Sequence, residues 1–153
     1  MKITISFILI FCFISFSCKT KKVTSPKAYE GKQLIFSHGG GFAGTYKTYY
    51  LLDNGQLFKN TNEFDKAQQT IGLSRDVTQQ IFSNYEVMGL GDRKVESYGN
   101  LNYSITMIDD NGSKHKLVWE KGQKGAEKLQ LYYKNVMSQI QKNNKKETEE
   151  VVR

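Results

Sequence analysis

Residues 45–52 carry tyrosines in both registers of a two-residue alternation, a pattern that suits a strand of a β-sheet. Asn54-Gly55 follows, and residues 56–58 are again partly apolar. Asn-Gly between two such segments is the strongest short-range signal of a β-hairpin. The apolar run at residues 34–36 predicts one further, short strand before this hairpin.

A second hairpin is predicted later in the chain. Residues 102–108 alternate as a strand, Asp110-Asn111-Gly112 predicts a turn, and residues 114–120 form the return strand. Successive side chains of a strand point to opposite faces, so every second residue of the return strand shares one face. Three large side chains are expected together on that face: His115, Leu117 and Trp119.

Two helices are predicted from apolar residues spaced three or four positions apart. Ser74 can cap the first helix, which should end at Gly89, with Leu90 packing back over its last turn. The second helix begins near Ala126, and the charged residues beyond Gln141 either extend it or fray. The apolar stripes are Val77, Ile81, Tyr85 and Met88 in the first helix, and Leu129, Tyr133, Val136, Met137 and Ile140 in the second.

Together these elements predict an α+β fold, with an antiparallel sheet of two hairpins and about five strands packed against two helices. We expect one domain over residues 32–141, preceded by a solvated tether at 18–31 and followed by a charged tail at 142–153. The chain has 22 Lys and Arg against 15 Asp and Glu, a net charge of +7. The basic residues form no cluster on one helix, which argues against a nucleic-acid partner.

The first residues predict export. After one lysine, an apolar run at residues 3–16 leads to Ser17-Cys18. The run is shorter than the roughly 20 residues that a transmembrane helix needs, so it is typical of a signal peptide. A small residue directly before a cysteine resembles the processing site of bacterial lipoproteins. This resemblance implies a signal peptide of residues 1–17, cleavage after Ser17, and acylation of Cys18, with palmitate among the attached chains.

Two observations bear on location. Ser15 and Ser17 also satisfy the small-x-small pattern of ordinary secretory cleavage, which would release a soluble protein instead. In some bacteria, lipoproteins of the cell surface resemble one another in an acidic cluster after the cysteine, whereas residues 19–22 here are basic. We therefore expect the periplasmic face of the outer membrane. The same lysines suit attraction to anionic lipid headgroups.

The glycine-rich segment at residues 39–44 matches the letters of the dinucleotide-binding pattern GxGxxG. That pattern needs a helix after the loop, whereas the residues after Gly44 predict a strand. The glycines then either take positive φ and allow close backbone packing in a hairpin loop, or form a flexible loop that presents an aromatic side chain to a partner. This candidate binding loop consists of Gly39, Gly40, Gly41, Phe42 and Gly44.

The sequence contains no recognisable set of catalytic residues or metal ligands. His38 and His115 are far apart, with no carboxylate at a ligand spacing, so we expect them to pack or face solvent. With Cys18 acylated and Cys12 removed with the signal peptide, no thiol remains for a disulfide, a zinc site or a nucleophile. We therefore expect no enzyme, no metal and no cofactor. The 9 tyrosines either pack on the sheet or form a sugar- or peptide-binding surface.

The order of these segments resembles the emfourin-like inhibitors of thermolysin-type metalloproteases. The resemblance covers residues 33–141 and rests on three segments. Gly40-Gly41-Phe42-Ala43-Gly44 precedes a strand, and Leu73-Ser74 begins a helix that ends at Gly89-Leu90. Tyr103-Ser104-Ile105-Thr106 leads through a hairpin to a final helix. It implies a small α+β protein that inhibits without chemistry of its own. This chain differs from that family in its lipid anchor, its tether and its basic charge.

From these features we expect a lipoprotein of the bacterial cell envelope, anchored in a membrane, that carries a small non-enzymatic binding domain. Its partner would be an envelope protein or a protease. The alternative is an inhibitor of thermolysin-like metalloproteases.

Overall fold

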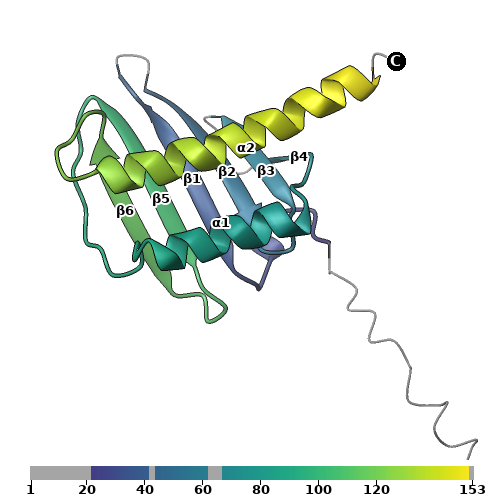
Figure 1. Ribbon diagram of the computed structural model, residues 1–153, viewed down its shortest axis with the longest axis horizontal. Helices are drawn as coiled ribbons and strands as arrows, with labels where there is room; N and C mark the ends of the chain where they lie inside the picture. The colour runs from purple at the N-terminus through teal and green to yellow at the C-terminus, as the bar shows by residue number, and fades with distance from the viewer. Residues whose placement is uncertain (1–21, 42–43, 62–66, 152–153) are drawn as a thin grey trace, which may run out of the picture.

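The structure of the chain is a computed structural model, which describes residues 22–41, 44–61 and 67–151. Its elements in chain order are the 3-10 turn η1 (Pro26–Ala28), β1 (Gln33–Gly40), β2 (Thr45–Leu52), β3 (Leu57–Thr61), β4 (Gln68–Thr70), α1 (Arg75–Val87), β5 (Leu101–Ile108), β6 (Lys114–Glu120) and α2 (Glu127–Val151). The strands form one antiparallel sheet in the order β4-β3-β2-β1-β5-β6. Both helices lie on the same face of this sheet (Figure 1). The predicted α+β class is therefore confirmed.

Strand β1 lies at the centre of the sheet and pairs along its whole length with β2 on one side and β5 on the other. The prediction of a short strand at residues 34–36 was too short, because these two neighbours pair with the backbone as far as Gly40 despite the weak strand preference of glycine. The sheet also has a sixth strand, β4, where about five were expected. Its sequence, Gln68-Gln69-Thr70, is polar and has no apolar alternation that would predict a strand.

The hydrophobic core lies between the sheet and the two helices. Leu34 and Phe36 of β1 are fully buried, and the Phe36 ring lies 6.0 Å from that of Tyr132 and 6.1 Å from that of Tyr133 on α2. The Tyr132 hydroxyl donates to the Ile81 carbonyl at 2.9 Å, which joins α2 to α1. The predicted apolar stripes of the two helices are confirmed: their residues are buried or packed against this core.

The ends of α1 follow local signals in the sequence. The Ser74 side chain accepts a hydrogen bond from the Val77 amide at 3.4 Å, as predicted for an N-cap. Gly89 has φ +63°, and the Leu90 amide donates to the Tyr85 carbonyl at 3.1 Å. This is the hydrogen-bonding pattern of a Schellman motif, and Leu90 is fully buried beneath it. The charged tail extends α2 as helix to Val151.

The predicted solvated tether at residues 18–31 is wrong for residues 23–31. The Val23 amide donates to Gln56 Oε1 at 2.9 Å, and Gln56 Nε2 donates back to the Val23 carbonyl at 2.9 Å. Pro26 is buried, and the Tyr29 hydroxyl donates to Asp53. These contacts place the start of the folded domain near Val23 rather than at residue 32. They depend on Gln56, which is distant in sequence, so local composition could not predict them.

Candidate functional site

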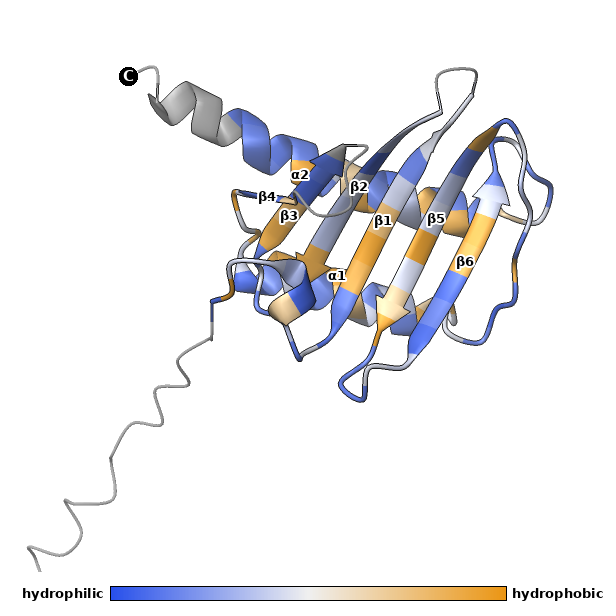
Figure 2. Ribbon diagram, turned by 180° about the vertical axis from the view of Figure 1, so that it is seen from behind, coloured by the Kyte–Doolittle hydropathy of each residue, from blue (hydrophilic) through white to orange (hydrophobic). Residues whose placement is uncertain are grey.

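Most of the face of the sheet opposite the helices is open (Figure 2), although Leu52 and Phe58, which alternate with core residues, are fully buried at its β2–β3 end. We call it the open face; it is formed by the side chains of β2, β1, β5 and β6 that alternate with those of the core. The segment that contains η1 crosses one end of it, in front of β2 and β1 (Figure 2). The side chains of the open face that matter below are Ile35, Ser37, Tyr46, Thr48, Tyr50, Asn102, Ser104, Thr106, Lys114 and Lys116.

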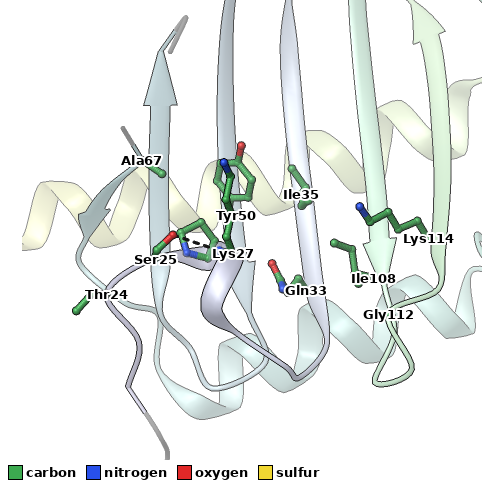
Figure 3. A pocket seen from close by; sticks show the side chains of 11 residues that line it. Thr24, Ser25, Lys27, Gln33, Ile35, Tyr50, Ala67, Ile108, Gly112 and Lys114 are labelled. Carbon is green, nitrogen blue, oxygen red and sulfur yellow. Dashed lines mark hydrogen bonds between the residues drawn. The ribbon is translucent and has the colours of Figure 1, made fainter. Parts of the chain in front are cut away.

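Two neighbouring hollows lie on the open face, and we call the two together the groove. The first, of about 490 Å³, lies beside the η1 segment, with Lys27 on one side and Lys114 on the other (Figure 3). The second, of about 620 Å³, extends toward the glycine-rich loop and is lined by Tyr46 and Lys116 among others. Ile35 and Tyr50 line both hollows, so the two lie next to each other.

The groove is lined by cations, hydroxyl groups and aromatic rings. Lys27, Lys114 and Lys116 contribute positive charge, and no aspartate or glutamate is among the described residues that line either hollow. Hydroxyl groups come from the middle of three neighbouring strands: Ser37, Thr48, Ser104 and Thr106. The Ser37 and Thr48 hydroxyl oxygens lie 3.0 Å apart and hydrogen-bond to each other. Such a surface can bind an anionic group and hydrogen-bond to a polar ligand at the same time.

The candidate binding loop joins β1 to β2 and borders this groove. Gly44 lines the second hollow. Gly41 and Gly44 have φ of +73° and +58°, and the Gly41 amide donates to the Asn100 carbonyl at 2.6 Å. The interpretation as a hairpin loop with positive-φ glycines is therefore confirmed. Phe42, Ser17 and Cys18, the other predicted site residues, lie outside the described residues.

Gly39 shows why this segment needs a residue without a side chain. A Cβ atom at Gly39 would lie 2.2 Å from the Thr45 carbonyl oxygen and 2.6 Å from the Tyr46 Cα, which are backbone atoms of the paired strand. We expect Gly39→Ala to lower the free energy of unfolding by about 3 kcal/mol, because β2 would have to move. Gly41→Ala is the matched control: it meets open space and should lose only about 1.5 kcal/mol, from its left-handed backbone. Urea titration measures both losses, and equal values would contradict this explanation.

Both histidines lie between the sheet and the helices. His115 Nε2 lies 2.8 Å from the Arg93 carbonyl, so this nitrogen carries the hydrogen; in the neutral ring Nδ1 then accepts from the Tyr85 hydroxyl, 2.8 Å away. Burial raises the pKa of Tyr85 to about 12, which keeps that hydroxyl protonated. His38 Nδ1 lies 2.6 Å from the Tyr133 hydroxyl oxygen. Among the described residues, no group of histidine, cysteine, aspartate and glutamate could hold a metal ion.

His38 predicts a pH dependence of stability. Burial, and then the charge of Lys47, lower the pKa of His38 below its ordinary value of 6.5. The unfolded chain therefore takes up this proton at a higher pH than the folded one, so the free energy of unfolding should fall as the pH drops below about 7. Urea titrations between pH 8 and 5.5 should show this fall, and His38→Asn should reduce it. An equal slope in the variant would exclude His38 as its source.

The groove residues were not predicted from the sequence. Lys114, Lys116, Ser104 and Thr106 alternate with core residues along their strands, so the polar register was visible. The alternation of polar residues does not show that the helices leave this face of the sheet uncovered. It also does not show that Lys27 lies across the first hollow from Lys114. Comparison of the chain with models of known protein families and with curated proteins finds no match.

Proposed function

We propose that the protein is a lipoprotein of the bacterial envelope, attached through Cys18, and that its domain is a non-enzymatic binding module whose site is the groove on the open face. The observation that supports this proposal is the division of the sheet into two unlike faces. The helix face holds the core, and the open face has a preformed groove with an apolar floor and polar walls. Concave sites of this kind, with a few polar groups placed around them, are typical of ligand-binding sites.

The composition of the groove distinguishes it from an ordinary solvated sheet face. Ile35 and Ile108 lie on the floor of the first hollow together with Tyr50, between the two flanking lysines (Figure 3). A sheet face that only contacts water is normally polar at every outward position. Apolar residues beneath converging charged groups therefore favour a bound ligand over plain exposure to solvent.

The proposed anchor would hold this groove close to the membrane. Val23 is fixed to the domain by its pair of hydrogen bonds with Gln56. Residues 19–22 alone separate it from Cys18, and a chain spans at most about 3.6 Å per residue, so the distance between the two is less than about 20 Å. The first hollow, which is lined by Thr24 and Lys27, would then be the end of the groove nearest the bilayer. No helix among residues 22–151 that the structure describes is long and apolar enough to cross a membrane.

The proposal is tested by photo-crosslinking in the bacterium that makes the protein. A photoreactive phenylalanine analogue is placed at Thr106, on the open face, or at Ser138, which is exposed on α2. We expect the full-length chain to crosslink to one defined envelope component from position 106 and not from position 138. Identical products from both positions, or none from position 106, would contradict the proposal.

A direct assay distinguishes the alternative function, inhibition of thermolysin-like metalloproteases, from the proposed binding module. The mature lipoprotein, purified in detergent, is mixed with thermolysin, and peptide hydrolysis is followed. We expect no inhibition at equimolar protein. Stoichiometric inhibition would replace the binding-module proposal with the inhibitor.

A further inference from the structure

We infer that the groove on the open face binds an anionic saccharide, a chain of sugars that carry acidic groups. This inference rests on the proposed function and names the ligand class of the same site. It follows from three features of the groove: its charge, its hydroxyl and aromatic groups, and the pairing of the central strands beneath it on both sides.

The charge of the groove favours an anionic ligand. Lys27 and Lys114 stand on opposite sides of the first hollow (Figure 3), and Lys116 lines the second. Lys114 and Lys116 are two residues apart on β6 and share the open face, so their Cα atoms are about 7 Å apart along the strand. No aspartate or glutamate is among the described residues that line the two hollows, and the Glu96 carboxylate accepts from the hydroxyl of Tyr98, which lines the second. The cations are spread along the groove, which suits a ligand with repeated acidic groups rather than one ion.

The remaining side chains suit a ligand that is rich in hydroxyl groups. Serine and threonine hydroxyls both donate and accept hydrogen bonds, as sugar hydroxyls do. The lining has four of them, together with the Asn102 amide. Aromatic rings offer flat apolar surfaces with a polar edge, and four tyrosines line the groove: Tyr46, Tyr50, Tyr98 and Tyr103. Tyr98 is 64% exposed and Tyr46 44%, so both rings are accessible to a ligand.

The backbone around the groove argues against an extended peptide as the ligand. Peptides commonly bind to a sheet by adding a strand to a free edge. The groove lies over β2, β1, β5 and β6, and β2, β1 and β5 are paired on both sides. The outer edge of β6 is occupied at Val118, because the Val118 amide donates to the Val95 carbonyl at 2.8 Å and the Ser97 amide donates to the Val118 carbonyl at 3.0 Å. Recognition in the groove therefore relies on side chains, as expected for a saccharide.

The test is calorimetric titration of the mature lipoprotein in detergent with four probes. These are oligogalacturonate, an uncharged malto-oligosaccharide of equal length, poly-L-glutamate, and glycerophosphoglycerol, the soluble headgroup of phosphatidylglycerol. We expect oligogalacturonate to bind and the uncharged sugar, the polypeptide and the headgroup to bind at least about tenfold more weakly, a difference of about 1.4 kcal/mol.

Matched double variants locate the site. Lys114→Gln with Lys116→Gln removes two charges from the groove, and Lys128→Gln with Lys134→Gln removes two exposed charges from α2 on the other side of the sheet. The first pair should weaken oligogalacturonate binding about tenfold or more, and the second by less than about twofold. Absence of oligogalacturonate binding, equal losses in the two double variants, or equal binding of poly-L-glutamate or glycerophosphoglycerol would overturn the inference. Photo-crosslinking at Thr106 separates the two proposals: if it still captures an envelope component, only the ligand class has failed.

Discussion

A chain with Cys18→Ala is expected to incorporate no acyl label and to keep residues 1–17. Acyl chains need the cysteine sulfur as their attachment point, and the resemblance to lipoprotein processing implies that cleavage follows acylation. The chain has 2 cysteines, so Cys12→Ala is a matched control that should be labelled and cleaved normally. Metabolic labelling with an alkyne-tagged palmitate and the intact mass of the purified chain measure both effects.

Two other results would change the assignment of the anchor. If Cys18→Ala is still cleaved after Ser17, the segment is an ordinary secretory signal and the protein is released. If the label survives Cys18→Ala but disappears in Cys12→Ala, the acceptor is Cys12.

Trp119→Ala is expected to lower the free energy of unfolding by about 4 kcal/mol, the largest loss that we predict for one side chain. Trp119 is 1% exposed; its ring stacks on that of Tyr103 at 5.8 Å and meets that of Tyr133 edge-on at 5.9 Å. Its Nε1 donates to Gln130 Oε1 at 3.0 Å, so the substitution removes this hydrogen bond as well as ring packing. Urea titration followed by circular dichroism measures the loss, because Trp119 is the only tryptophan of the chain.

Tyr98→Ala is the control for this experiment, since it removes an aromatic ring from the open face. Tyr98 is 64% exposed, so its loss should change the free energy of unfolding by less than about 0.5 kcal/mol. A small loss for Trp119→Ala, or a similar loss for both variants, would contradict the division of the sheet into a core face and an open face.

Much of the fold could be predicted because its signals are local. Strands β2 and β6 have the bounds that the alternation predicts, and the β2–β3 turn coincides with Asn54-Gly55, where Gly55 has φ +88°. The caps of α1 depend on residues within one turn of its ends. The full length of β1 and the docking of Val23 depend instead on partners far along the chain, which a local pattern does not contain.

The candidate site was harder to predict than the fold. The glycine-rich loop was recognised as a hairpin loop, but the groove beside it was not. Lys27 and Lys114 lie on opposite sides of the first hollow. They line the same hollow because β1 and β5, which are distant in sequence, pair side by side. The tyrosines lie in two different environments: Tyr85, Tyr132 and Tyr133 pack in the core, whereas others line the groove. Only the position of the helices distinguishes the two sets, and the local sequence does not show it.

The most direct test of the proposed binding site compares the tyrosines that line the groove with those of the core. The mature lipoprotein is produced with fluorotyrosine at its 9 tyrosines, the resonances are assigned by Tyr→Phe variants, and a solubilised envelope fraction is added. The account predicts that the fluorine resonances of Tyr46, Tyr50 and Tyr98 shift, while those of the core residues Tyr85, Tyr132 and Tyr133 stay in place. Unchanged resonances for the open-face tyrosines, or shifts confined to the core set, would contradict it.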